Sequence, residues 1–214
     1  MQFPDWDAVL RLLALYAHVL ACFAAAAGIV LGDLAVFMRR RIDHEQLREG
    51  TVWVSRALLA LWITGLVIIG IDTGFAPAAI VSKGKLLAKL AVVVVLTLNG
   101  FALHRWALPR LLAPAGDADY ARQAAKVPSL LGAVSACSWL FAAFLGLAKV
   151  LATVMGVGGF LELYGLGLAL AMAVAWVWAR PRLARQLREP SPASAAMALD
   201  ALHSESRLEG LWGT

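Results

Sequence analysis

The sequence predicts an all-α membrane protein, a polytopic helical bundle of five transmembrane helices with its N-terminus outside and its C-terminus in the cytoplasm. Three observations predict this fold class. First, 61% of the 214 residues are hydrophobic and only 15% are charged, whereas a soluble domain has about 45–50% apolar and about 25% charged residues. Second, five apolar stretches reach the roughly 20 residues that cross a bilayer. Third, the basic residues between these stretches are strongly biased to one side.

The five apolar stretches set the expected helices in chain order. They span residues 12–37, 52–71, 86–103, 129–148 and 160–179. The first is not typical of a cleavable signal peptide, because no basic region precedes it, its apolar run is too long, and three arginines follow it at 39–41.

Two further segments complete the expected organisation. The polar, Ala-rich stretch 115–126 indicates a short cytoplasmic helix before the fourth span. After Arg188 the composition shifts to Pro and Ser, which indicates a flexible cytoplasmic tail. We therefore expect one membrane domain over 1–188 and a tail over 189–214.

The distribution of Lys and Arg orients the bundle. Thirteen basic residues fall on the side of the first and third connections and the C-terminus, and four fall on the other side. Positive charge accumulates in cytoplasmic segments, so the side with thirteen is predicted to be cytoplasmic. Because the charge follows topology, it does not indicate nucleic-acid binding. The four on the predicted outer side are Arg11, Lys83, Lys85 and Lys149.

Small residues recur at four-residue spacing on several predicted helices, and such stripes let helices approach closely in lipid. Packing within one bundle is one interpretation, and self-association into a homo-oligomer or a larger complex is the other. The stripes are Ala24, Gly28 and Gly32 on the first helix, Ala142 and Gly146 on the fourth, and Gly165, Ala169 and Ala173 on the fifth.

Polar residues at membrane depth are costly and are functional candidates by default. On the predicted cytoplasmic side these are Asp33, Arg56, Asn99 and His104. Asp33 and Arg56 lie at matching depth on the first two helices, so we expect an ion pair between them. The set is either a structural clamp near the headgroups or a proton-handling or substrate site.

On the predicted outer side, His18 lies two turns into the first helix and Lys89 one turn into the third, again at matching depth. His18 shares a helix face with Cys22, Ala25 and Gly32, which we expect to face the bundle interior. Three roles stay open for His18: a haem ligand or proton carrier, a structural hydrogen bond, or an exposed interfacial residue. Tyr16 and Tyr164 are expected as interfacial rings.

A neutral His on the inner face of a bundle can hold haem iron. His104 lies at the opposite end of the membrane, and His44 and His203 lie in cytoplasmic segments. Ligation by two histidines of one chain is therefore disfavoured. Cys22 and Cys137 are expected to pack as small apolar residues, and without a CxxC or Cys/His pair they give no support to zinc or iron–sulfur chemistry.

Short motifs in the first four helices carry a resemblance to known families. They are His18, Ala27-Gly28, Arg56, Thr64-Gly65, Lys89-Leu90 and Val127-Pro128. Together they resemble the small membrane protoporphyrinogen oxidases that bind b-type haem, and the related copper-resistance D-like membrane domains. The resemblance implies that His18 and Lys89 serve haem and redox chemistry. The chain departs from the oxidase pattern at Asn99-Gly100 and at Ala125-Lys126.

These observations favour a multi-pass protein of a bacterial-type inner membrane that binds haem b in the outer half of the bundle. Such a protein, if it is an enzyme, is a membrane oxidoreductase that acts with quinone or porphyrin. The alternatives are a transporter of a small solute, proton or metal ion, or an accessory subunit of a larger membrane complex. Motifs of soluble hydrolases and nucleotide-binding enzymes are absent from the sequence.

Overall fold

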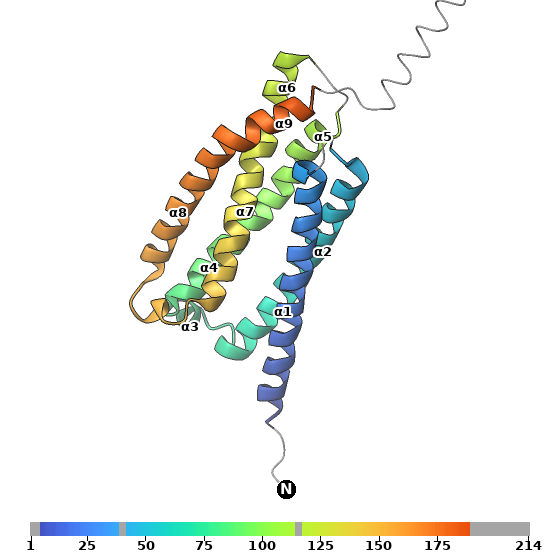
Figure 1. Ribbon diagram of the computed structural model, residues 1–214. Helices are drawn as coiled ribbons and strands as arrows, with labels where there is room; N and C mark the ends of the chain where they lie inside the picture. The colour runs from blue at the N-terminus through green and yellow to red at the C-terminus, as the bar shows by residue number, and fades with distance from the viewer. Residues whose placement is uncertain (1–4, 39–41, 114–116, 189–214) are drawn as a thin grey trace, which may run out of the picture.

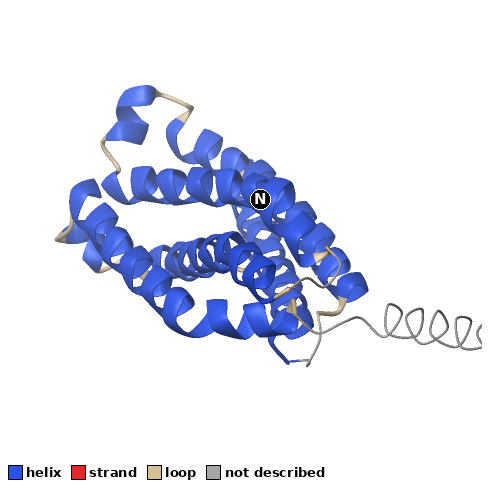
Figure 2. Cartoon of the chain, turned by 90° about the horizontal axis from the view of Figure 1, so that it is seen from above, coloured by secondary structure: helices blue, strands red, loops and turns tan. Residues whose placement is uncertain are grey.

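The described part of the protein is built of helices and loops. The computed structural model describes residues 5–38, 42–113 and 117–188. Within these residues no strand occurs (Figure 2), and five helical stretches are long and apolar enough to cross a membrane. The predicted all-α fold and its five spanning helices are confirmed. The predicted tail over 189–214 lies outside the described residues.

The helices follow one another along the chain with short connections (Figure 1). Short π-helical turns (η1, η2 and η4) interrupt three of the spans, and all three turns lie toward the end of the bundle that carries α5, α6 and α9. The elements are α1 (Trp6–Asp33), η1 (Leu34–Met38), α2 (His44–Thr73), α3 (Pro77–Val81), α4 (Gly84–Ala102), η2 (Leu103–Ala107), α5 (Leu108–Leu111), α6 (Ala118–Ala124), α7 (Lys126–Leu147), the 3₁₀ turn η3 (Leu151–Thr153), α8 (Val157–Val174), η4 (Ala175–Ala179) and α9 (Arg180–Gln186).

The first two spans begin earlier than hydropathy predicts, because capping residues rather than the limits of the apolar runs set where they start. The Asp5 carboxylate accepts from the backbone N–H of Asp7 at 3.1 Å, which starts α1. The Asp43 carboxylate accepts from the backbone N–H of Gln46 at 3.0 Å, which starts α2. Such caps satisfy amide groups that have no partner inside the helix. The expected short helix before the fourth span is present as α6.

Helices α1 and α2 form an antiparallel pair whose backbones nearly touch. A Cβ added to Gly50 would lie 3.0 Å from the carbonyl oxygen of Gly28 and 3.0 Å from the amide nitrogen of Gly32. A Cβ added to Gly28 would lie 2.9 Å from Val54 Cγ2. The small-residue stripe of the first helix therefore packs within the molecule, as the first interpretation expects. By contrast, the stripe on α8 (Gly165, Ala169 and Ala173) is exposed.

Helices α4, α7 and α8 form the second unit (Figure 1). Its core lies at the end near α3 and is closed by aromatic and small side chains: Ala88, Val92, Phe141, Leu145, Ala148, Phe160 and Tyr164. Tyr164 is buried and hydrogen-bonds Ser138 at 2.7 Å. The prediction that its ring lies at the membrane interface is therefore wrong. The reason is that Tyr164 lies on the face of α8 that packs against α7, where Ser138 satisfies its hydroxyl.

The two units join at the opposite end, where α5, α6 and α9 lie. The shared core there is Ala35, Val36, Leu47, Leu111, Ala121, Ala124, Ala125, Leu183, Ala184 and Leu187. Side chains of α9 also satisfy the carbonyls that end the first span: Arg182 donates to Phe37 O at 2.7 Å, and Gln186 donates to Val36 O at 2.8 Å. The first and last spans are thereby tied together.

The glycine contact predicts a sharp difference between two substitutions. Gly50→Leu should destabilise the protein by about 1–3 kcal/mol, because the added carbons meet backbone that cannot move aside. Gly100→Ala should be neutral or slightly stabilising, since no atom lies within 4 Å of its Cβ position and Ala favours helix. Thermal unfolding of both variants in the same detergent measures the difference, and equal stabilities would contradict the close crossing.

Candidate functional site

His18 faces α2 rather than the lipid. Its Nδ1 lies 2.8 Å from Thr64 Oγ1, and its Cε1 lies 3.6 Å from the position a Cβ would take on Gly65. The prediction that this face of the first helix points to the interior is confirmed in part, since Ala25 on the same face is fully buried whereas Cys22 is exposed. The Thr64 hydroxyl therefore holds the imidazole, and the ring lies beside Gly65, where an added Cβ would make an ordinary van der Waals contact.

The hydrogen bonds of Thr64 determine which ring nitrogen of His18 carries the proton. A threonine hydroxyl has one hydrogen to donate and two lone pairs. Thr64 Oγ1 lies 2.7 Å from Ala60 O, and a carbonyl can only accept. The hydroxyl is thus the acceptor toward His18, and Nδ1 carries the hydrogen. In the neutral imidazole Nε2 then holds an available lone pair, and Nε2 makes no hydrogen bond within the described residues.

Lys89 of α4 brings a positive charge to the same place. It is half-buried and lies close enough for its charge to act on the His18 imidazole and on the Cys22 thiol one turn further along α1. Among the residues that the structure describes, no acceptor forms a hydrogen bond or ion pair with its ammonium. The charge of Lys89 thus acts on His18, which was predicted at the same depth, and no hydrogen bond joins the two side chains in the described residues.

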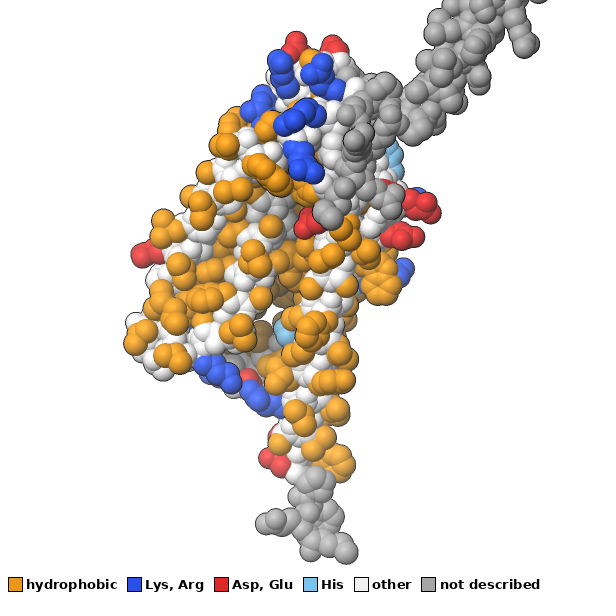
Figure 3. Space-filling view, in the orientation of Figure 1, with side chains coloured by type: hydrophobic (Ala, Val, Ile, Leu, Met, Phe, Trp, Pro, Cys, Tyr) orange, Lys and Arg blue, Asp and Glu red, His pale blue; other side chains and the backbone are white. Residues whose placement is uncertain are grey.

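The region between the two helical units is open around these residues. The core at this end belongs to α4, α7 and α8 and contains no residue of α1 or α2. Figure 3 shows this face of the molecule hollowed between α1 and α7, with hydrophobic side chains on both sides and Lys and Arg side chains at its lower edge. The hollow is crossed on one side by a hydrogen bond of 3.0 Å from Trp62 Nε1 to Thr97 Oγ1. We call it the α1–α4 hollow.

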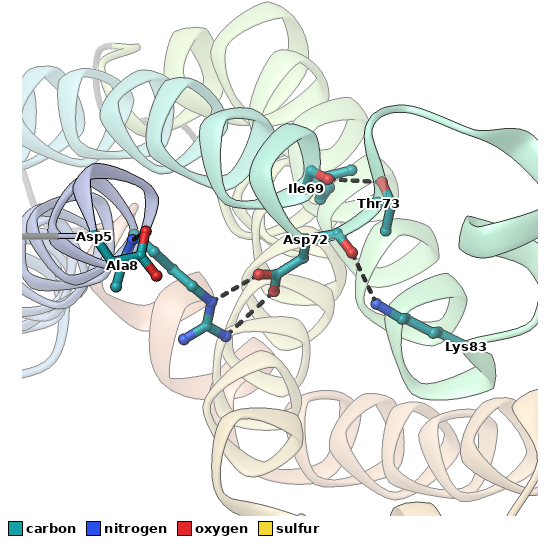
Figure 4. Close-up of polar contacts among 7 residues, drawn as sticks. Asp5, Ala8, Ile69, Asp72, Thr73 and Lys83 are labelled. Atoms are coloured by element: carbon teal, nitrogen blue, oxygen red, sulfur yellow. Dashed lines mark hydrogen bonds and ion pairs between the residues drawn. The ribbon is translucent and has the colours of Figure 1, made fainter.

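A polar network at the edge of the α1–α4 hollow was not expected from the sequence. Arg11 Nε donates to Asp72 Oδ1 at 2.7 Å, and its second contact to Oδ2 is 3.3 Å. Lys83 Nζ donates to the backbone oxygen of Asp72 at 3.3 Å (Figure 4). The predicted second span ends at residue 71, but α2 continues to Thr73. The ends of an antiparallel helix pair meet, and this rule would have paired Arg11 with Asp72.

The predicted ion pair between Asp33 and Arg56 is wrong. Both side chains are exposed, and no ion pair joins them in the residues that the structure describes. Their depths match, but depth does not fix direction around a helix. Helix α2 faces α1 with Gly50, Val54 and Ala57, and at 100° per residue Arg56 points away from that face.

The other two members of the predicted cytoplasmic-side set have separate structural bonds. Asn99 is buried and its Nδ2 donates to Leu131 O of α7 at 3.1 Å, which clamps α4 to α7. His104 is exposed, and its Nδ1 lies 2.9 Å from Gly100 O of its own helix. These contacts do not bring the four residues of the set into one hydrogen-bonded cluster.

The donor set around His18 is small. In the described ranges, no three His, Cys, Asp or Glu side chains come together as a metal-binding group. Searches of family models, curated proteins and solved structures give no match to this chain.

The assignment of the His18 proton can be measured directly. Nitrogen-15 NMR of histidine-labelled protein should show neutral His18 protonated at Nδ1, because Thr64 accepts there. Thr64→Val removes the acceptor and should give a mixture of both tautomers. Thr97→Val is the control, since Thr97 bonds Trp62 and should leave the His18 signals unchanged. An Nε2-protonated imidazole in the unchanged protein would contradict the assignment.

Proposed function

We propose that this protein is an integral membrane redox protein that binds b-type haem in the α1–α4 hollow. His18 would hold the iron through Nε2, and Lys89 would pair with a propionate or with an anionic substrate. The observation that carries the proposal is the hydrogen bond from His18 to Thr64. Metal-binding histidines commonly donate their other ring nitrogen in this way, which fixes the ring and directs the lone pair to the metal.

The residues present fit haem better than they fit a bare metal ion. Haem iron needs a single protein nitrogen from this chain, because the porphyrin supplies four ligands itself, while a bare ion needs several protein ligands. Cys22 and Lys89 flank His18, and the unpaired ammonium of Lys89 suits the carboxylates of haem. Bound haem would supply one-electron chemistry, and quinone in the bilayer is the redox partner we propose.

A visible spectrum tests the proposal. Protein purified in detergent and supplemented with haem should show a Soret band, and His18→Ala should abolish it because the other histidines of the described residues, His44 and His104, lie toward the opposite end of the bundle. His104→Ala is the matched control, since that ring bonds its own helix and its loss should leave the band unchanged. A preparation that stays colourless after supplementation, or a band that survives in His18→Ala, would overturn the proposal.

We further propose a bacterial-type inner membrane location with the N-terminus outside and the C-terminus in the cytoplasm. The support is the excess of Lys and Arg at the end that carries α5, α6 and α9. A green fluorescent protein fused after residue 214 should fluoresce, and alkaline phosphatase fused there should be inactive. Active phosphatase at that position would reverse the orientation.

A second candidate function is that of a subunit in a homo-oligomer or a larger membrane complex. The exposed small-residue stripe on α8 favours it, because such a face allows close helix contact in lipid. A partner could also complete the coordination of a haem held by His18. Mass measurement in detergent would decide, since a complex should lose its partner in Ala169→Leu while a monomer stays unchanged.

A further inference from the structure

The edge of the α1–α4 hollow carries more positive charge than the fold requires. Arg11, Lys83, Lys85 and Lys89 belong to this end of the bundle, and among the described residues the Asp72 carboxylate forms its ion pair with Arg11. The excess Lys and Arg at the opposite end follow from membrane topology. Membrane topology does not explain the positive charge at this end, because this end is predicted to face outward, where Lys and Arg are otherwise few.

The contacts among these residues leave most of the charge uncompensated. Arg11 neutralises the Asp72 carboxylate. Lys83 bonds the backbone oxygen of Asp72, which carries no net charge. Lys85 lies one turn before Lys89 on α4, and their charges repel. Lys83, Lys85 and Lys89 thus form a row along the start of α4, and no ion pair joins any of them to an acid among the described residues.

We infer that the α1–α4 hollow accepts a carboxylate-bearing amphiphile that enters past Lys83 and Lys85 and places its carboxylate at Lys89. The inference rests on the proposed function in one respect, that the hollow is the ligand site. The row of cations attracts anions and repels metal ions. The hydrophobic side chains on both sides of the hollow suit the apolar body of the ligand (Figure 3).

The charge pattern makes opposite predictions for acid and base substitutions. Lys89→Gln, and the double variant Lys83→Gln with Lys85→Gln, should each weaken carboxylate binding by about threefold or more. Asp72→Asn should strengthen it by about twofold, because it removes the negative charge at the edge. A structural role for Asp72 would instead weaken binding, so the sign of this change separates the two explanations.

The probe is cis-parinaric acid, a fluorescent fatty acid, compared with its uncharged methyl ester. Both are added to the full-length protein in nanodiscs of zwitterionic lipid, at a pH where the acid is ionised. Binding is read as parinarate emission sensitised by the tryptophans. We expect saturable binding of the acid, and for the ester the same unsaturable signal as in empty nanodiscs. Lys126→Gln, at the opposite end of the bundle, is the control and should bind the acid normally.

The outcomes separate this inference from the haem proposal. Equal signals for acid and ester, or acid binding that is unchanged in the lysine variants, would overturn the inference. His18→Ala should leave parinarate binding intact, because the carboxylate does not need the imidazole. A haem band that fails to appear beside charge-dependent parinarate binding would refute the haem proposal alone. Circular dichroism confirms that each variant is folded.

Discussion

The close crossing of α1 and α2 is the constraint on which the rest of the structure depends. Gly28 and Gly50 let the two backbones touch, with Gly50 lying against the backbone of Gly28 and Gly32, which fixes both the distance and the register of the pair. In an antiparallel pair the residue numbers fall along α1 as they rise along α2, so facing residues have numbers with a nearly constant sum. Gly32 meets Gly50, His18 meets Thr64 and Arg11 meets Asp72, and the numbers of each pair add to 82 or 83. The histidine bond and the edge network are therefore consequences of the glycine contact.

The molecule stays open on one side because the α1–α2 pair and the α4, α7 and α8 unit are joined mainly at one end. A shared core and the bonds of Arg182 and Gln186 unite them at the end that carries α9, whereas the core at the other end belongs to α4, α7 and α8. In water such a gap would close, because apolar walls would be driven together. Lipid removes that driving force, and helices then associate where small residues or polar bonds hold them. The α1–α4 hollow can persist because, in the described residues, the polar bonds between its walls are few: the Trp62–Thr97 bond and the bond from Lys83 to the Asp72 backbone at its edge.

Much of the fold could be predicted from the sequence, and the failures share one cause. Hydropathy gave the five spans because membrane thickness sets their length, and counting turns from the flanks put His18 and Lys89 at one depth. Depth is one coordinate of a side chain, and the direction around the helix is the other. Asp33 and Arg56 match in depth but not in direction around their helices. Tyr164 faces the interior of the bundle, where its hydroxyl hydrogen-bonds Ser138 of the neighbouring helix. Helix starts at Asp5 and Asp43 were missed because polar capping residues lie outside the apolar runs.

The two groups at the centre of the hollow restrict its ligand more than either does alone. His18 presents a lone pair at Nε2 because Thr64 donates its hydrogen to Ala60, so His18 can bind an electron-pair acceptor or a hydrogen-bond donor. Lys89 presents a positive charge without a partner in the described residues, so Lys89 can bind an anion. A bare metal ion can bind His18 Nε2 but is repelled by the charge of Lys89. A simple anion binds Lys89 but does not bind the lone pair of His18. A metal centre that carries its own carboxylates can bind both His18 and Lys89. The haem proposal uses both groups and the carboxylate inference uses Lys89, so the two proposals concern the same side of the bundle.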